Sequence, residues 1–493
     1  RSVSAFLLNR SSDLRVCRHM LFEILHQLPQ PTFVGGHGRE AVVGGVVIGP
    51  GIETGNGFTH AEHCARATRD GPPPGRIVGC MTEQRPDPTG RDDRDNRTVE
   101  RLRPLGETIF ATMSRLAADT GAINLGQGYP DWDGPWPVLR EAAAQILGGN
   151  NQYAPGRGDE RLRRAICDDR RRRLGQDWDP GTECLVTVGA TEAIAATMLG
   201  LVEPGARVVL VEPYYDAYRA AAMLAGADID SVPLVRADGR WRLDTDALAR
   251  AVTDRTALIV LNSPHNPTGA LLDEGELTAV AELAVRHDCL VLSDEVYEHL
   301  LYDGRKHLSI SQMPGMRRRS IVVSSTAKTF NVTGWKTGWA LAAPEVLKGV
   351  ATAKQFLSYV GAAPLQPAVA LALNEHGDWV SGLVETLEGN RDYLTGELKA
   401  LGLDVVPAEG GYFVVADVRP LGLGNAMQTC LALPEAAGVA AIPVTAFVDD
   451  PEDPRWRDLV RFGFCKRREV LEEGIGRIRE YLARGNAVEE TGE

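Results

Sequence analysis

Apolar runs of strand length alternate with amphipathic segments of helical length through the middle of the chain. The strand-length runs cover residues 184–188, 207–211, 257–261, 289–292 and 321–323. Helical periodicity marks residues 192–202, 217–225 and 274–286. Continuous apolar strands between amphipathic helices predict an α/β fold, with a mostly parallel sheet covered by helices on both faces. Ligands of such sheets bind beyond the carboxyl ends of the strands.

The pattern changes beyond about residue 350, where longer helical segments take over. These cover residues 345–359 and 379–401, and short strand-like runs follow at 412–416 and 459–464. This change predicts a second, smaller α+β domain. The domain boundaries that we expect are an N-terminal arm with part of the small domain over 96–150, a large domain over 151–345, the small domain over 346–484 and a tail over 485–493.

Residues 1–95 differ from the rest because they have no sustained periodicity. They contain a glycine-rich stretch at 35–57 and a turn-rich GPPPG at 71–75. Such a composition is typical of a disordered segment. Met81 opens a highly charged stretch, so we hypothesise that it is the true start and that the first 80 residues are a misplaced extension. An intact mass of the native protein that includes residues 1–80 would contradict this hypothesis.

The composition narrows the function classes. With 493 residues, 44% of them hydrophobic, the chain can fill a sizeable core. Its formal charge of -13 argues against a nucleic-acid partner, and no apolar run approaches the roughly 20 residues of a membrane span. The eight cysteines have no paired spacing and no metal-ligand spacing, which favours a reducing cytoplasm and no metal site. We expect a cytoplasmic protein that acts on small molecules.

The segment STAKTFNVTGWK at 325–336 carries the most specific chemistry, because it places Lys328 directly after an apolar run. A lysine amine condenses with a carbonyl group only when it is deprotonated, and a dry pocket or a nearby cation lowers its pKa. Ser325 and Lys336 could hold a phosphate. An exposed lysine without a function is the alternative. A buried strand that leads into a tight, aromatic-lined turn favours an anchor for an aldehyde cofactor with a phosphate.

Two further loops follow predicted strands. Residues 189–192, which include Ala190 and Thr191, join a strand to a helix, so their backbone N–H groups could bind a phosphate. A plain turn is the alternative there. The loop NSPHNPTG at 262–269 is stiffened by two prolines, and Asn266 is a candidate hydrogen-bonding residue for a ligand.

Three more side chains have both a structural and a functional interpretation. Asp294 lies at the mouth of a predicted buried strand, where it needs a cationic or donor partner such as a protonated pyridine nitrogen. Tyr297 follows three residues later and could reach a phenolate oxygen of the same cofactor. Arg461 alternates with apolar neighbours on a predicted strand, so it forms either a salt bridge or a bidentate clamp for a substrate carboxylate.

In order and combination, these segments resemble the class I, fold-type I pyridoxal-phosphate aminotransferases over about residues 100–484. The chain resembles the kynurenine, glutamine and methionine aminotransferase branch in four segments: NLGQGYP at 124–130, NQY at 151–153, EPYYD at 212–216 and TGWK at 333–336. Within this branch, the chain resembles the actinobacterial N-succinyldiaminopimelate aminotransferases in VGATEA at 188–193, NSPHNPTG at 262–269, YVGAAP at 359–364 and FCKR at 464–467.

The resemblance implies a large domain with a mostly parallel sheet, a smaller α+β domain and pyridoxal 5'-phosphate as the cofactor. Lys328 would bind the cofactor's aldehyde carbon and carry the substrate's α-proton, while Asp294 would keep the ring nitrogen protonated. The remaining cofactor contacts that it implies are Tyr215 on the ring, Asn266 and Tyr297 at the phenolate oxygen, and Ala190, Thr191, Ser325 and Lys336 at the phosphate.

The resemblance also implies a homodimer with shared active sites, in which Tyr153 would reach the phosphate of the neighbouring subunit. The substrate-binding residues would be Gly128, Asn266 and Arg461, and no metal is implied. Lys336 replaces an arginine of many family members, as it does in the kynurenine branch. Thr191 stands where an aromatic residue is frequent, which argues against a preference for aromatic substrates.

The function we predict is transfer of an amino group between an amino acid and a 2-oxo acid. N-succinyl-LL-2,6-diaminopimelate and 2-oxoglutarate are the expected pair, on the route to lysine. The alternatives are a broad kynurenine, glutamine or methionine aminotransferase and a cysteine-conjugate β-lyase. A transcriptional regulator with an aminotransferase-like domain is disfavoured because the N-terminal segment has no run of periodic helices. A nicotinamide dehydrogenase is disfavoured because no glycine-rich dinucleotide fingerprint follows a strand.

Overall fold

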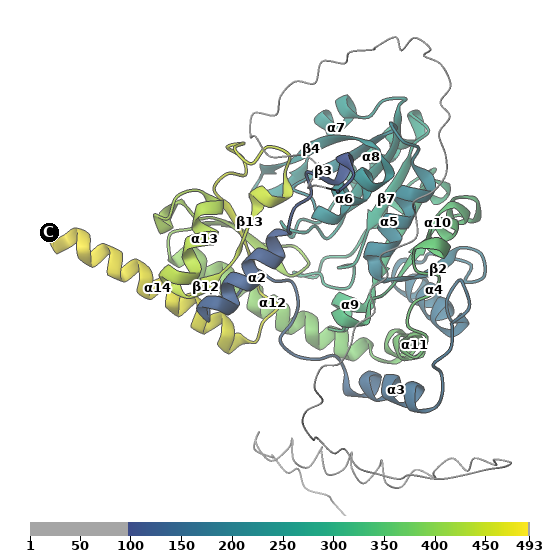
Figure 1. The fold of residues 1–493 in the computed structure, drawn as a ribbon, viewed down its shortest axis with the longest axis horizontal. Coiled ribbons are helices and arrows are strands. Elements are labelled where there is room, and N and C mark those ends of the chain that lie inside the picture. Colours follow the sequence, from purple (N-terminus) through teal and green to yellow (C-terminus); the bar gives the residue numbers. More distant parts are fainter. Residues whose placement is uncertain (1–96, 492–493) are drawn as a thin grey trace, which may run out of the picture. The chain divides into compact units, whose positions relative to one another are not determined.

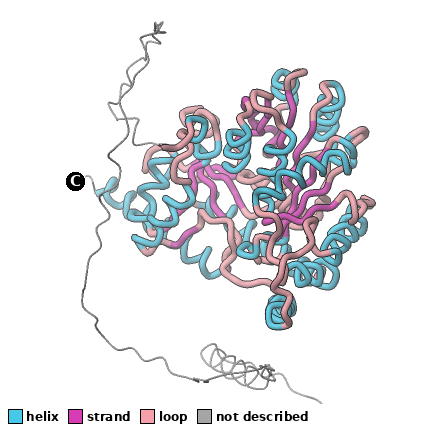
Figure 2. Tube along the Cα trace, turned by 45° about the vertical axis from the view of Figure 1, so that its right-hand side comes forward, coloured by secondary structure: helices cyan, strands magenta, loops and turns pink. Residues whose placement is uncertain are grey.

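The computed structural model describes residues 97–491, which belong to the compact unit Arg91–Glu493 (Figure 1). The predictions for residues 1–95, including the start at Met81, lie outside the described residues. Figure 2 shows the strands of the described part in two groups, each flanked by helices.

The larger group is an eight-stranded sheet with the order β2-β9-β8-β7-β6-β3-β4-β5. Its strands are β2 (Cys184–Val188), β3 (Arg207–Glu212), β4 (Asp228–Ala237), β5 (Arg240–Leu243), β6 (Thr256–Asn262), β7 (Leu290–Asp294), β8 (Ser320–Ser325) and β9 (Thr337–Leu341). The run from β4 through β3, β6 and β7 to β8 is parallel, whereas β5 and β9 are antiparallel to their neighbours. The predicted mostly parallel sheet is confirmed.

Alternate residues of the strands face opposite sides of this sheet. In β3, Val208 and Leu210 pack with the helices α5 (Gly189–Leu201), α6 (Asp216–Ala225) and α10 (Pro344–Leu357). Val209 and Val211 pack on the other face, with α7 (Thr245–Ala251) and α8 (Glu274–Arg286). This period of two explains the continuous apolar runs in the sequence, because both faces of each central strand are buried.

Three further helices cover the β9 end of the sheet. They are α3 (Trp136–Leu147), α4 (Glu160–Leu174) and α11 (Leu365–Glu375). Val186 of β2 and Leu341 of β9 pack against apolar residues of these helices. The short helix α9 (Thr326–Thr329) follows β8 directly, and the 3-10 turn η5 (Thr333–Trp335) leads into β9. Lys328 therefore lies on a single helical turn at the end of a buried strand.

The smaller group is a four-stranded sheet with the order β10-β11-β14-β13, in which each neighbouring pair is antiparallel. Its strands are β10 (Asp404–Val406), β11 (Phe413–Asp417), β13 (Ile442–Pro443) and β14 (Leu459–Gly463). The helices α2 (Ile109–Thr120), α12 (Gly377–Ala400), α13 (Ala426–Ala437) and α14 (Arg468–Thr491) lie around it (Figure 1). A parallel pair, β1 (Ile123–Asn124) with β12 (Val439–Ala440), joins the N-terminal segment to this region.

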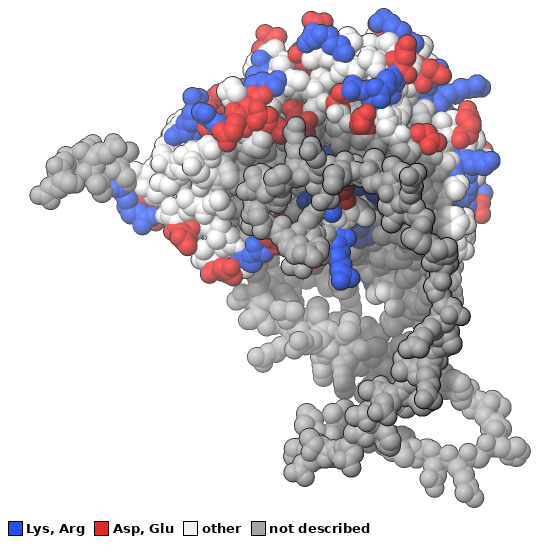
Figure 3. Space-filling view, turned by 45° about the horizontal axis from the view of Figure 1, so that its top comes forward, with Lys and Arg blue, Asp and Glu red and all other residues white. Residues whose placement is uncertain are grey.

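Acidic and basic side chains are interspersed on the face of the described residues shown in Figure 3, without a large area of one sign. Among the helices of the described residues, none combines the length and apolarity needed to cross a membrane.

Candidate active site

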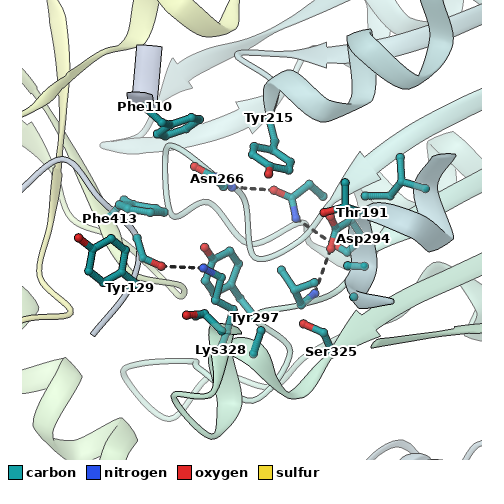
Figure 4. Close-up of a pocket in the computed structure, with 18 of the residues that line it drawn as sticks. Phe110, Tyr129, Thr191, Tyr215, Asn266, Asp294, Tyr297, Ser325, Lys328 and Phe413 are labelled. Carbon is teal, nitrogen blue, oxygen red and sulfur yellow. Dashed lines mark hydrogen bonds between the residues drawn. The ribbon is translucent and has the colours of Figure 1, made fainter. Parts of the chain in front are cut away.

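A cavity of about 310 Å³ lies where the carboxyl ends of the central strands meet the smaller sheet (Figure 4). Asn262 ends β6, Asp294 ends β7 and Ser325 ends β8, and all three line the cavity. Of the predicted site residues, the cavity also brings together Gly128, Ala190, Thr191, Tyr215, Asn266, Tyr297, Lys328, Lys336 and Arg461. Only Tyr153, among the predicted residues, is not part of its lining.

Lys328 extends from α9 into this cavity, where its Nζ donates a hydrogen bond of 2.6 Å to the carbonyl of Gly128 (Figure 4). Burial, together with the positive charges of Arg461 and Lys336, lowers the pKa of Lys328 to about 8, although Cys465 and Asp294 oppose this shift. The hydroxyl of Tyr412 donates to the backbone carbonyl of Lys328 at 2.5 Å. The amine is thus held in place, and a sizeable neutral fraction near pH 8 makes it a nucleophile.

Asp294 is a buried carboxylate with two donors. The hydroxyl of Tyr218 lies 2.7 Å from Oδ2, and the backbone N–H of Val296 lies 3.2 Å from Oδ1. Burial raises the pKa of Asp294 to about 6 against the effect of both hydrogen bonds. The Asn262 side chain donates to the backbone carbonyl of Asp294 at 2.9 Å. This carboxylate can therefore pair with a cationic nitrogen of a ligand in the cavity.

The first turn of α5 forms one end of the cavity. Gly189 has a φ of +70°, which allows the chain to turn from β2 directly into the helix, so that Ala190 and Thr191 line the cavity. The free N–H groups and the helix dipole favour a phosphate at this position. A Cβ atom at Gly338 of β9 would lie 2.6 Å from the Ala190 backbone nitrogen. The turn therefore packs against β9 without space for a side chain.

Arg461 is a buried cation contributed by β14 of the smaller sheet. Its Nη1 donates to Asn266 Oδ1 at 2.9 Å and its Nη2 donates to the Gly126 carbonyl at 2.5 Å. The guanidinium lies 3.9 Å from the ring centre of Phe413, and Nε has no partner among the described residues. Burial lowers the pKa of Arg461 to about 10, so it stays charged at neutral pH. No carboxylate of the described residues pairs with it, which excludes the structural salt bridge there.

Two phenols complete the walls of the cavity. Burial raises the pKa of Tyr215 to about 12, and it also raises the pKa of Tyr297. Both hydroxyls are therefore protonated donors at neutral pH. The Tyr215 ring packs edge to face on Tyr218, with 5.7 Å between ring centres. These rings limit the width of the cavity beside Asp294.

Tyr153 lies on the surface, with 82% of its side chain exposed. It borders a separate hollow formed by residues 151–153 and 360–364, and its ring contacts Tyr359 edge to face at 5.4 Å. Within one chain it does not approach Lys328, so its role toward a neighbouring subunit stays a prediction.

Several lining residues were not predicted from the sequence. Tyr218 could have been found, because it lies three residues after Tyr215 and so occupies the same face of α6. Asn262 could have been found as the last residue of its strand. Phe110 of α2 and Phe413 of β11 had no local signal, since tertiary packing alone brings them to the cavity.

A charged cluster lies behind the cavity. Glu295, Glu298 and His307 are buried close together and could in principle hold a metal ion. Nη1 of Arg170 lies 2.7 Å from Glu295 and 2.5 Å from Glu298. The positive charge between these carboxylates is therefore supplied by an arginine, and the cluster has a structural explanation.

The comparisons with known proteins agree with this geometry. The sequence profile for "Aminotransferase class I and II" matches residues 120–478. The chain is 54% identical over 388 residues to the probable N-succinyldiaminopimelate aminotransferase DapC of Mycobacterium tuberculosis, covering 77% of this chain and 98% of that protein. It is 34% identical over 401 residues to kynurenine–oxoglutarate transaminase 3 of Rattus norvegicus, covering 76% and 88%.

Among solved structures, N-succinyldiaminopimelate aminotransferase from Mycobacterium tuberculosis superposes with a TM-score of 0.76, covering 78% of this chain and all of that one. The predicted family and fold class are confirmed by these matches. The chain belongs to the class I and II aminotransferase family and is an aminotransferase enzyme.

Proposed function

We propose that this enzyme uses pyridoxal 5'-phosphate to transfer an amino group between N-succinyl-LL-2,6-diaminopimelate and 2-oxoglutarate, on the route to lysine. The observation that carries the reaction is the buried Lys328 amine, whose pKa is lowered to about 8 by burial first and nearby cations second. The 54% identity to the mycobacterial protein supports the substrate.

The residues of the cavity fit the proposed cofactor at three points. The first turn of α5, with Ser325 and Lys336, offers positive potential and hydrogen-bond donors for its phosphate. Asp294 offers a buried carboxylate for its ring nitrogen, and Lys328 offers an amine for its aldehyde. Tyr215, Asn266 and Tyr297 would contact the ring and its phenolate oxygen. When bound, the cofactor supplies an electron sink for the substrate's α-carbon.

Side chains and backbone groups of the protein would move the proton, bind the substrate and exclude water. Lys328 would take the proton from the substrate's α-carbon and return it to the cofactor side. Arg461, fixed by Asn266 and Gly126, would bind the substrate's α-carboxylate together with the Gly128 backbone. The phenols and the aromatic rings around them would keep water away from the reacting atoms.

The far end of the substrate meets no further cation in the described lining. Lys328, Lys336 and Arg461 are the lysines and arginines that line the cavity, and each already has a proposed partner. Within one chain, a succinyl group would therefore meet neutral side chains such as Tyr129. A broad kynurenine, glutamine or methionine aminotransferase, or a β-lyase side reaction, is the second candidate, because no cation of the described lining is left to select the succinyl carboxylate.

We also propose that the enzyme is a cytoplasmic homodimer in which Tyr153 reaches the partner's phosphate site. The exposed ring of Tyr153 supports the dimer, and the five described cysteines, all free and buried, support a reducing compartment.

The proposal is tested with Lys328→Ala. This change should abolish turnover and remove the absorbance of the covalently bound cofactor, because no other described amine is placed at the aldehyde. Lys348→Ala is the matched control, since Lys348 is exposed on α10, and it should leave both unchanged. Full activity in Lys328→Ala would refute the assignment.

The substrate is tested separately by steady-state rates on a panel of amino donors with 2-oxoglutarate. We expect the highest kcat/KM for the succinylated diamino acid. A strong preference for kynurenine would replace it with the second candidate while leaving the cofactor assignment intact.

A further inference from the structure

Tyr218, which also lines the cavity, donates a hydrogen bond from its hydroxyl group to the carboxylate of Asp294. The oxygen lies 2.7 Å from Oδ2, and both side chains are almost fully buried, with 3% exposed. We propose that Tyr218 is a positioning residue that keeps Asp294 ionised, so that Asp294 can pair with the protonated ring nitrogen of the cofactor. This inference rests on the proposed cofactor, and it names the residue that controls the charge of the carboxylate beside the cofactor's ring nitrogen.

The hydrogen bonds of Asp294 point to Tyr218 as the controlling group. Val296 donates a longer backbone hydrogen bond of 3.2 Å to the other oxygen, Oδ1. Among the described residues, Tyr218 provides the only side-chain donor to this carboxylate. The backbone carbonyl of Asp294 is fixed independently by the Asn262 side chain at 2.9 Å. Removing the Tyr218 hydroxyl therefore changes the charge balance more than it changes the backbone position.

The groups facing Asp294 leave its ionisation finely balanced. Burial and the adjacent Glu295 disfavour the carboxylate, whereas Tyr218, the Val296 N–H and the charge of Lys328 on α9 favour it. The hydroxyls of Tyr215 and Tyr297 are neutral near it at neutral pH. With these opposing effects the pKa of Asp294 stands at about 6, so a lost donor moves it into the neutral range.

Tyr218 is suited to be a permanent donor. Burial and the charge of Asp294 raise its pKa well above that of a free tyrosine, so it stays protonated throughout the working pH range. Its ring is fixed edge to face against Tyr215, with an interplanar angle of 86°. Phenylalanine keeps this ring packing and removes only the hydroxyl.

The test compares Tyr218→Phe with Tyr214→Phe in the full-length chain. Tyr214 is a buried neighbour whose hydroxyl donates to Asp449 at 2.7 Å, and it does not line the cavity. The equilibrium Kd for pyridoxal 5'-phosphate is measured between pH 6 and pH 9 by the absorbance of the bound cofactor. Thermal unfolding of the cofactor-free variants checks that both are folded.

We expect the Kd of Tyr218→Phe to exceed that of the wild type by about five- to tenfold at pH 6.5 and to approach it at pH 9. The sign follows because the raised pKa of Asp294 in Tyr218→Phe leaves this carboxyl group uncharged at pH 6.5, whereas at pH 9 it is ionised in both proteins. The magnitude follows because the loss of a hydrogen bond to a charged group shifts a pKa by about one to two units. Ionisation of Lys328 changes the Kd of both proteins by the same factor, so it cancels in the ratio of the two Kd values. Tyr214→Phe should give a ratio near one throughout.

A double variant tests the route of the effect. In an Asp294→Asn background, Tyr218→Phe should change Kd by a factor that does not depend on pH, because no carboxylate is left to titrate. An unchanged Kd in Tyr218→Phe would overturn the inference, and so would an increase in Kd that is the same at all pH values. In either case, cofactor binding by the wild-type chain would still support the proposed function. Failure of the wild-type chain to bind the cofactor through Lys328 would instead overturn the proposed function, and this inference with it.

Discussion

At the scale of single residues, Arg461 is notable because it is a buried cation without a buried counter-charge. Its Nη groups bond to neutral oxygens, and its Nε is unpaired among the described residues. Such a group is unfavourable in the empty site, because burial removes hydration that no carboxylate replaces. A substrate carboxylate would relieve this penalty, so in the proposed role Arg461 would destabilise the protein without substrate and bind the substrate when it is present.

Arg461→Lys should lower kcat/KM for amino donors by about ten- to a hundredfold, because lysine keeps the charge but loses the planar fork. Steady-state kinetics check this loss, and urea unfolding should show no loss of stability of comparable size. Arg457→Lys is the control, since Arg457 is half exposed and lies outside the lining. A wild-type kcat/KM in Arg461→Lys would contradict the role in carboxylate binding.

The residues at the strand ends were predictable because chemistry and position coincide there. Asp294, Asn266 and Lys328 each follow an apolar run, and the sequence predicts that they line a ligand site, which the shared cavity agrees with. Phe110 and Phe413 could not be found in this way, because an aromatic residue at an apolar position is equally typical of a core. Their place in the cavity depends on how the smaller sheet packs.

At the scale of elements, the junction of β2, α5 and β9 forms the end of the cavity where we propose that the phosphate binds. Prediction started the helix at residue 192, whereas α5 begins at Gly189, so the predicted loop is the first turn of the helix. The strand β9 was not predicted, because its residue Trp339 was interpreted as part of an aromatic-lined turn. It becomes a strand through pairing with both β2 and β8. The two-residue strands β1, β12 and β13 are too short to give a period.

Gly338→Ala tests this junction. Its Cβ would lie 2.6 Å from backbone atoms of Gly189 and Ala190, so the first turn of α5 must move. We expect the affinity for pyridoxal 5'-phosphate to fall about tenfold or more and the stability to fall by about 1–3 kcal/mol. Cofactor titration and urea unfolding measure the two effects.

Gly382→Ala in α12 is the matched control, because a Cβ at Gly382 would meet no atom within 4 Å. It should leave cofactor binding unchanged and raise the stability by up to about 1 kcal/mol, since alanine favours a helix over glycine. Normal cofactor affinity in Gly338→Ala would show that the close packing of β9 on α5 is unimportant for the phosphate site.

At the scale of the whole molecule, the described residues combine a mostly parallel sheet with a smaller antiparallel sheet around a shared cavity. The alternation of strands and helices predicted the larger part, and the change near residue 350 predicted the smaller one. The boundaries of the predicted domains stay predictions. What no local pattern contained is the association of α2 and β1 with the C-terminal elements, because it depends on pairing between distant segments.

The proposed dimer gives a prediction by complementation between subunits. Tyr153→Ala and Lys328→Ala chains should each have little activity alone, because one lacks the shared contact and the other lacks the amine. Mixed dimers would contain one site with Lys328 of one subunit and Tyr153 of its partner. Unfolding and refolding an equal mixture should therefore restore on the order of a quarter of the wild-type sites. Absence of any recovery in mixed dimers isolated by two affinity tags would contradict the shared site.

The pairing of β1 with β12 has a consequence for the order of events during synthesis. Ile123 pairs with Val439, and the Gly126 carbonyl accepts a hydrogen bond from Arg461, so these residues have no partner until a segment about 300 residues later has been synthesised. At typical ribosomal speeds this delay lasts roughly 15–60 s. During that interval the larger sheet can assemble on the ribosome, while the N-terminal strand stays without its partner. The cavity is therefore completed only after β14, which contributes Arg461, has emerged from the ribosome.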